Sequence, residues 1–192
     1  MWNHKKVCLK LDENENKFPI EILNITDITE LEIIGGNFSF ITSFIEVLNN
    51  LEKLTIVSTK ISEFPKEIFE LPKCKYLSLK NNRIQTLPQL TKKSSIETLI
   101  LNKNYISEIN HLLEYMPNLK ILDLGSNLFQ DFPLSVTTLS QIKRLNFESN
   151  RLTTIPSSLQ CLNHLNHLNL DNNRFSILEK SKIHLLFNIQ LP

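Results

Sequence analysis

This sequence has few glycines, no long apolar run and almost no excess of charge of one sign. Each of these shortages excludes a class of function. Only three of the 192 residues are glycines, and Gly35-Gly36 lies outside any GxGxxG or Walker pattern, so no nucleotide-binding loop is expected. No stretch approaches the ~18 apolar residues of a membrane span. The net charge is +1 with both signs mixed, and basic residues do not cluster with stacking aromatics, so nucleic acid is not expected as a partner.

Cysteine is also sparse. The three cysteines are odd in number and none belongs to a clustered cap. The first residues of the chain lack the uninterrupted apolar segment of a secretory signal. The sequence therefore favours a cytoplasmic location, where thiols stay reduced, or export without a classical signal peptide.

Candidate catalytic and metal-binding residues are isolated from one another. His164 and His167 are three residues apart, but no Cys, Asp or Glu completes a metal site at a recognisable spacing. Cys8 and Cys161 have no evident His–acid arrangement that would activate a nucleophile. We therefore expect no catalytic residue, no metal ligand and no cofactor, and we do not expect an enzyme.

The dominant feature of the sequence is a period of about 23 residues that runs almost its whole length. Apolar residues recur at positions 1, 4 and 6 of each unit, a polar residue at position 9, and an apolar one at position 11. The triplets at positions 1, 4 and 6 are Ile28-Leu31-Ile33, Leu51-Leu54-Ile56, Cys74-Leu77-Leu79, Ile96-Leu99-Leu101, Leu119-Leu122-Leu124, Ile142-Leu145-Phe147 and Leu165-Leu168-Leu170. A fixed period in this range indicates a solenoid, in which stacked units share one core.

Each unit is predicted to begin as a short strand, and five of the seven units then turn beside an asparagine, with Thr59 and Gly36 in that place in the two earlier units. Positions 4 and 6 face the core and positions 3, 5 and 7 face outward, because side chains alternate along a strand. An Asn amide both donates and accepts hydrogen bonds. It can therefore satisfy backbone groups that the turn leaves without partners. Position 9 is filled in five consecutive units by Asn82, Asn104, Asn127, Asn150 and Asn173.

A second motif, an apolar residue followed by proline, marks the return path of most units. It occurs at Phe64-Pro65, Leu87-Pro88, Phe132-Pro133 and Ile155-Pro156. Proline disfavours helix in the preceding residue, so the chain is expected to stay extended there, before a short helical or 3₁₀ turn. The whole pattern resembles the leucine-rich repeat family in its LxxLxLxxNxLxxLPxxLxxL form. The resemblance implies an α/β solenoid shaped as a curved horseshoe, with a parallel sheet on the concave side and short helical turns on the convex side.

The N-terminal end of the chain departs from the repeat. Val7, Leu9 and Leu11 alternate like a strand, so residues 5–27 are predicted to form a degenerate capping repeat. Seven repeats are then expected over residues 28–185.

The C-terminal end is predicted to add a partial strand. Leu186, Ile189 and Leu191 again fit positions 1, 4 and 6, so residues 186–192 are interpreted as an eighth strand of a single domain, 1–192. An unpaired strand edge can pair with another chain. Fraying of this edge, and hence a monomer, is the favoured outcome, and an end-to-end dimer is the alternative.

The outward positions vary between units, which indicates a surface that folding does not use. Tyr76, Ile100 and Ile121 lie there on three adjacent strands, which are spaced ~4.8 Å apart. They are expected to form an exposed apolar patch. Tyr105 and Leu128, at position 10 of neighbouring units, would extend this patch toward the rim of ascending loops.

Positive charge is expected around the patch, from Lys53, Lys80 and Arg144. An aromatic and aliphatic centre with a polar rim is typical of a protein-binding hot spot, although scattered exposed apolar residues are also normal. The strand face alone offers ~400 Å², below the ~800 Å² per partner of a standard interface. A partner is therefore expected to touch the loop rim as well.

The sequence thus predicts a non-catalytic protein–protein interaction module that binds a protein partner through its concave face and loop rim. Two roles remain open, a bacterial host-interaction protein and a regulatory or scaffold subunit that docks on an intracellular enzyme. The composition, rich in Asn, Lys and Ile, suggests a bacterial or protist source.

Overall fold

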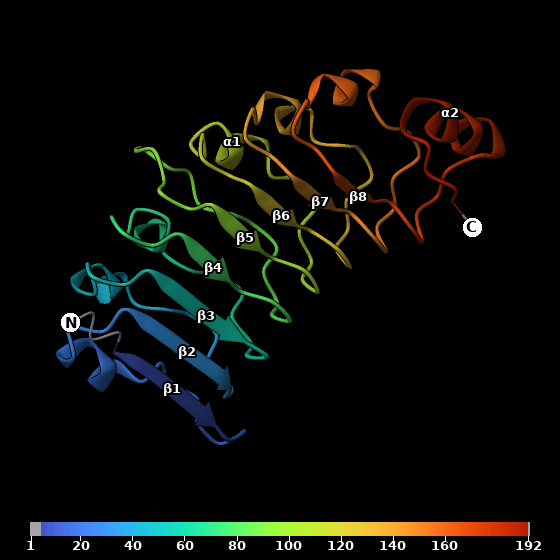
Figure 1. Cartoon of the computed structure of the whole chain (residues 1–192). Helices are drawn as coiled ribbons and strands as arrows, with labels where there is room; N and C mark the ends of the chain where they lie inside the picture. Colours follow the sequence, from blue (N-terminus) through green and yellow to red (C-terminus); the bar gives the residue numbers. More distant parts are fainter. Residues whose placement is uncertain (1–4, 192) are drawn as a thin grey trace.

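The computed structural model describes residues 5–191 and contains one curved sheet of eight parallel strands (Figure 1). The strands follow one another in sequence order, and each is hydrogen-bonded to the next. They are β1 (Lys6–Leu11), β2 (Glu30–Gly35), β3 (Lys53–Val57), β4 (Tyr76–Ser78), β5 (Thr98–Ile100), β6 (Ile121–Asp123), β7 (Arg144–Asn146) and β8 (His167–Asn169). The predicted curved solenoid with a parallel sheet is confirmed.

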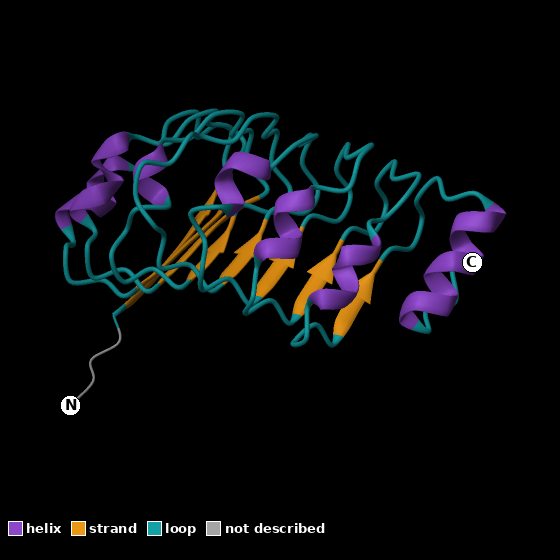
Figure 2. Cartoon of the chain, turned by 90° about the horizontal axis from the view of Figure 1, so that it is seen from above, coloured by secondary structure: helices purple, strands orange, loops and turns teal. Residues whose placement is uncertain are grey.

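Short helices follow the strands along the outer side of the sheet, as the view from above shows (Figure 2). They are η1 (Ile20–Asn24), η2 (Ser43–Val47), η3 (Lys66–Ile68), α1 (Asn110–Leu113), η4 (Leu134–Thr138), η5 (Ser157–Cys161) and α2 (Ile177–Phe187). Four of the five 3₁₀ helices have a proline as the N-cap residue, just before the first helical residue, where its fixed φ restricts the path by which the chain enters the helix. The unit between η3 and α1 has no helix. This unit is one residue shorter than the units on either side of it.

The core is continuous from the first unit to the last. The register places Leu77, Leu99 and Leu122 side by side on β4, β5 and β6, and all three are fully buried. Cys74 stands at position 1 of its unit and is also fully buried. Burial raises the pKa of its thiol to about 12, so this side chain serves as a small apolar residue of the core.

The position-9 asparagines form the predicted ladder beneath the turns. Asn127 is representative: its Nδ2 donates to the carbonyl oxygens of Leu101 (3.1 Å), Leu124 (3.1 Å) and Gly125 (3.3 Å). Its Oδ1 accepts the backbone N–H of Ile106 in the preceding unit (3.0 Å). Each amide thereby satisfies backbone groups of two neighbouring units and fixes their spacing.

The residue at position 8 of each unit, just before the position-9 residue, has a left-handed backbone conformation. This geometry turns the chain sharply out of the strand in every unit. The non-glycine residues with positive φ at this position are Ser58, Asn81, Lys103, Ser126, Ser149 and Asn172.

The predicted eighth repeat strand at residues 186–192 is wrong for the part of the segment that the structure describes. Leu186 lies in the last turn of α2, which ends at Phe187. The residues that follow, up to Leu191, form no strand. The helix prevails because Ser176 caps it, accepting the N–H of Glu179 (3.1 Å), as an S-x-x-E sequence favours. Apolar spacing alone did not reveal this cap. The strand edge proposed for an end-to-end dimer is therefore absent from the described residues.

Candidate protein-binding surface

The three apolar residues predicted to form a patch lie on neighbouring strands of the concave face. Tyr76 on β4 and Ile121 on β6 are both aligned with Thr98 on β5, which stands between them. Ile100 lies one outward position further along β5, between Ser78 and Asp123. Tyr76, Ile100 and Ile121 are each half-buried. They form a shallow triangle around Thr98, which we call the apolar triangle.

The predicted cations flank the apolar triangle. Lys53 is aligned with Tyr76, and its Nζ lies 5.1 Å from the centroid of the Tyr76 ring, a cation–π geometry. Arg144 is aligned with Ile121 on the other side and is exposed. Lys80, just beyond the end of β4, is exposed as well. The apolar triangle is therefore bordered by positive charge on both sides.

Tyr105 and Leu128 occupy successive places on the rim of loops that follow the strands. The N–H of Tyr105 donates to Ile84, and the N–H of Leu128 donates to Ile106, both at 2.8 Å. Tyr105 is 49% exposed, whereas Leu128 is half-buried. The position-7 residues Asn102 and Gly125 separate this rim pair from the apolar triangle along the chain.

A row of hydrogen-bonded polar side chains covers the C-terminal part of the concave face, and the sequence analysis missed it. Asp123 Oδ1 accepts from Asn146 Nδ2 (2.8 Å), and Asn146 Oδ1 accepts the N–H of Glu148 (2.9 Å). Glu148 Oε2 then accepts from Asn169 Nδ2 (3.2 Å), and Asn169 Oδ1 accepts the N–H of Asp171 (3.1 Å). The signal was present in the polar residues at positions 5 and 7 of successive units. We call these five residues the acid–amide row.

The Asp123 carboxyl at the start of this row has a perturbed pKa. Burial disfavours its charged form and raises the pKa above the ordinary value of 3.8, and the charge of Glu148 adds to the shift. Hydrogen bonds from Gly125 and Asn146 and the charge of Lys80 oppose it. Since burial is the largest contribution, the folded state binds the Asp123 proton more tightly than the unfolded chain does.

This pKa shift predicts a pH-dependent stability. The free energy of unfolding should fall as the pH rises from 3.8 through the raised pKa, because the folded state must give up a proton it prefers to keep. Asp123→Asn keeps both acceptor contacts and removes that cost. We expect the variant to be more stable than wild type in urea melts at neutral pH and equal to it near pH ~3. A variant that is less stable at neutral pH would contradict this account.

Charges at the beginning of the strands are already paired within the protein. Glu97 makes ion pairs with Lys120 and, at 3.5 Å, with Lys75. The Lys120 ammonium is the main cause of the lowered pKa of the Glu97 carboxyl. These three side chains lie at the edge of the sheet opposite to the loop rim, where they link the beginnings of β4, β5 and β6.

The other residues that the sequence analysis considered for chemistry lie apart. His164 and His167 are both exposed, and within residues 5–191 no three His, Cys, Asp or Glu side chains come together as a metal site would need. Cys8 and Cys161 are free and exposed. In the same residues, no helix has the length and apolar character that crossing a membrane requires.

A sequence profile described as leucine rich repeat matches residues 49–106 and 117–175, which together exceed half of the chain. The chain belongs to the leucine-rich repeat family. It is 31% identical over 150 residues to an adenylate cyclase of Schizosaccharomyces pombe. This match covers 73% of the chain but only 9% of the cyclase. This fold is generally a scaffold for protein–protein interaction.

Solved leucine-rich repeat structures superimpose on nearly all of the chain. A leucine-rich repeat protein of Leptospira interrogans has a TM-score of 0.72 and 27% identity, and the match covers 92% of this chain and 52% of that one. An internalin of Listeria monocytogenes has a TM-score of 0.75 at 24% identity, over 94% of this chain and 52% of that one. This chain thus spans about half the length of each of these structures.

Proposed function

We propose that this leucine-rich repeat chain is a non-catalytic module that binds a protein partner through its concave face and loop rim. The observation that carries the proposal is the apolar triangle of Tyr76, Ile100 and Ile121, half-exposed on a sheet face and bordered by cations. Aromatic and aliphatic side chains with a charged border are what protein-binding hot spots contain. Folding does not require these outward side chains, since the core residues lie on the other face.

The concave face has a positively charged part and a negatively charged part, and it favours a partner whose charges are arranged in the opposite way. Lys53, Lys80 and Arg144 border the apolar triangle, whereas Asp123, Glu148 and Asp171 lie in the acid–amide row. A partner segment with an apolar centre and carboxylates beside it would meet the cationic border, and Tyr105 and Leu128 on the rim would enlarge the contact. Complementary charges of this kind chiefly set specificity and association rate.

Two biological settings fit such a module. Similarity to a small part of an adenylate cyclase favours a regulatory or scaffold subunit that docks on an intracellular enzyme. A host-interaction protein is the other setting that the sequence leaves open. Both settings use the same surface, so one binding experiment addresses them together.

The test is a cross-linked pull-down from host and source-cell lysates with three proteins: wild type, Tyr76→Ala/Ile121→Glu, and Leu134→Glu as the control. Leu134 is 65% exposed in η4, away from the concave face. A partner captured by wild type and by the control, and reduced at least ~10-fold with the double variant, would support the proposal. Equal capture by all three folded proteins would contradict it.

A further inference from the structure

The strongly exposed large apolar side chains of the described residues gather at the two ends of the solenoid. At the N-terminal end they are Ile20, Phe40, Phe44 and Val47, and on α2 they are Ile177, Leu178 and Leu185. In the described chain, only Tyr105 and Leu134 are exposed to this extent elsewhere. Single exposed apolar residues are ordinary, but grouped ones mark interaction surfaces. The two groups lie at opposite ends of the molecule, near β1 and at α2 (Figure 1).

The N-terminal group surrounds a hollow. Ile20, at the start of η1, and Phe40, just before η2, line one depression of about 900 Å³ together with Leu11 and Phe18. Ile20 is 59% exposed and Phe40 is 61% exposed. Phe44, in η2 and two residues after Thr42 of this lining, is 67% exposed. We call this surface the N-terminal hollow.

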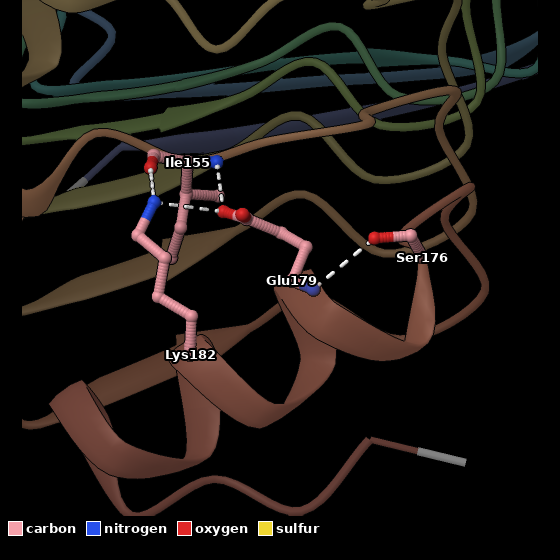
Figure 3. Close-up of polar contacts among 4 residues, drawn as sticks. All are labelled: Ile155, Ser176, Glu179 and Lys182. Atoms are coloured by element: carbon pink, nitrogen blue, oxygen red, sulfur yellow. Dashed lines mark hydrogen bonds and ion pairs between the residues drawn. The ribbon is translucent and has the colours of Figure 1, made fainter.

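The C-terminal group lies on a helix with a fixed orientation. Glu179 Oε1 accepts the N–H of Ile155 (3.0 Å), and Lys182 Nζ donates to the carbonyl oxygen of Ile155 (3.2 Å) (Figure 3). These contacts, with the buried Ile183, hold one face of α2 on the last repeat. Leu178 and Leu185 are seven residues apart and therefore share a helix face, and each is 83% exposed. With Ile177 they form what we call the α2 stripe.

The two ends carry opposite charge. Between Lys5 and Val47 the sequence has eight carboxylates and four lysines, and two of these carboxylates are paired, Asp27 with Lys5 and Glu32 with Lys6. The N-terminal hollow itself is lined by Glu15 and Glu21 and by one lysine, Lys17. Between Arg174 and Leu191 the sequence has three Lys or Arg residues and one carboxylate. That carboxylate, Glu179, is paired with Lys182. The C-terminal end thus carries an exposed apolar stripe and a net positive charge, and the N-terminal end carries an apolar hollow and a net negative charge.

We propose that copies of this chain associate head to tail, with the α2 stripe of one copy seated in the N-terminal hollow of the next. The contact joins two different surfaces, so each added copy leaves one hollow and one stripe free and the assembly grows instead of closing as a two-fold dimer. It involves neither the apolar triangle nor the loop rim, so the proposed partner-binding face stays open along the assembly.

The experiment is sedimentation velocity of the full chain at rising concentration. Wild type should form species larger than a dimer, and added NaCl should weaken them because the ends attract by charge. Phe40→Glu, which places a charge in the lining of the hollow, and Leu185→Glu, which damages the stripe, should each weaken self-association at least ~10-fold. Leu134→Glu, an exposed apolar residue at neither end, should associate like wild type.

Mixing the two damaged variants decides the geometry. Phe40→Glu keeps its stripe and Leu185→Glu keeps its hollow, so an equimolar mixture should give a dimer that grows no further. A wild type that stays monomeric would overturn the proposal, as would a mixture that stays monomeric. Association that survives in either single variant would mean a symmetric contact and would also overturn it. Far-UV circular dichroism checks folding, and Ile20→Glu and Leu178→Glu replace any variant that fails to fold.

Discussion

Leu99→Ala is expected to lower the free energy of unfolding by about 2–5 kcal/mol. Leu99 is fully buried at the centre of β5, and the register places Leu77 and Leu122 beside it on the adjacent strands. Truncation removes apolar burial and leaves a cavity between repeats. Neighbouring units cannot close this cavity easily, because the strand spacing is also fixed by backbone hydrogen bonds and by the asparagine ladder.

The matched control for this substitution is Thr98→Ala on the same strand. Thr98 points to the concave face and is half-buried, so its truncation should cost well under ~1 kcal/mol. Urea unfolding of both variants, followed by circular dichroism, measures the difference. If Thr98→Ala cost as much as Leu99→Ala, the assignment of inward and outward faces would be contradicted.

Asn127→Ala is expected to destabilise the fold by about 3–5 kcal/mol, because several backbone groups lose their partner at once. Asn127 is only 5% exposed. The substitution leaves the N–H of Ile106 without its acceptor and removes the side-chain donor to Leu101 and Leu124. A buried donor or acceptor without a partner costs more than the hydrogen bond itself contributed.

Asn173→Ala separates the effect of burial from that of the hydrogen bonds. Asn173 occupies the same position in the last unit, and its Oδ1 accepts the N–H of Leu152 while its Nδ2 donates to Phe147 and Leu170. It is half-buried, so water can replace part of the lost hydrogen bonding. Urea melts should show about half the loss seen for Asn127→Ala. Equal losses would mean that desolvation does not govern the ladder.

The sheet and the ladder could be predicted because both follow from spacing along the chain. Leu99 and Asn127 stand at positions 4 and 9 of a repeating unit, and units that share this pattern stack in the same register. The apolar side chains are then buried, and the backbone groups of the turns find hydrogen-bond partners, in the same way from one unit to the next. The same regularity allowed Tyr76, Ile100 and Ile121 to be placed on one outward face before the structure was known.

The C-terminal segment shows where spacing misleads. Leu186 fits position 1 of a further repeat, yet it lies in α2, because the Ser176 cap and the anchors from Glu179 and Lys182 to Ile155 favour a helix. Those anchors join residues more than twenty positions apart. A pattern of apolar residues carries no information about them.

The sequence by itself therefore determined the repeat, the parallel sheet and the inward or outward direction of each strand residue, since these depend on period and alternation. The tertiary structure decided which side chains meet across units: Asp123 with Asn146, Lys53 over Tyr76, and Ile20 with Phe40 around the N-terminal hollow. These meetings depend on side-chain length and direction and on the local path of each return loop. The tertiary structure also decided how the last unit is covered, through contacts that α2 makes only once folded against Ile155.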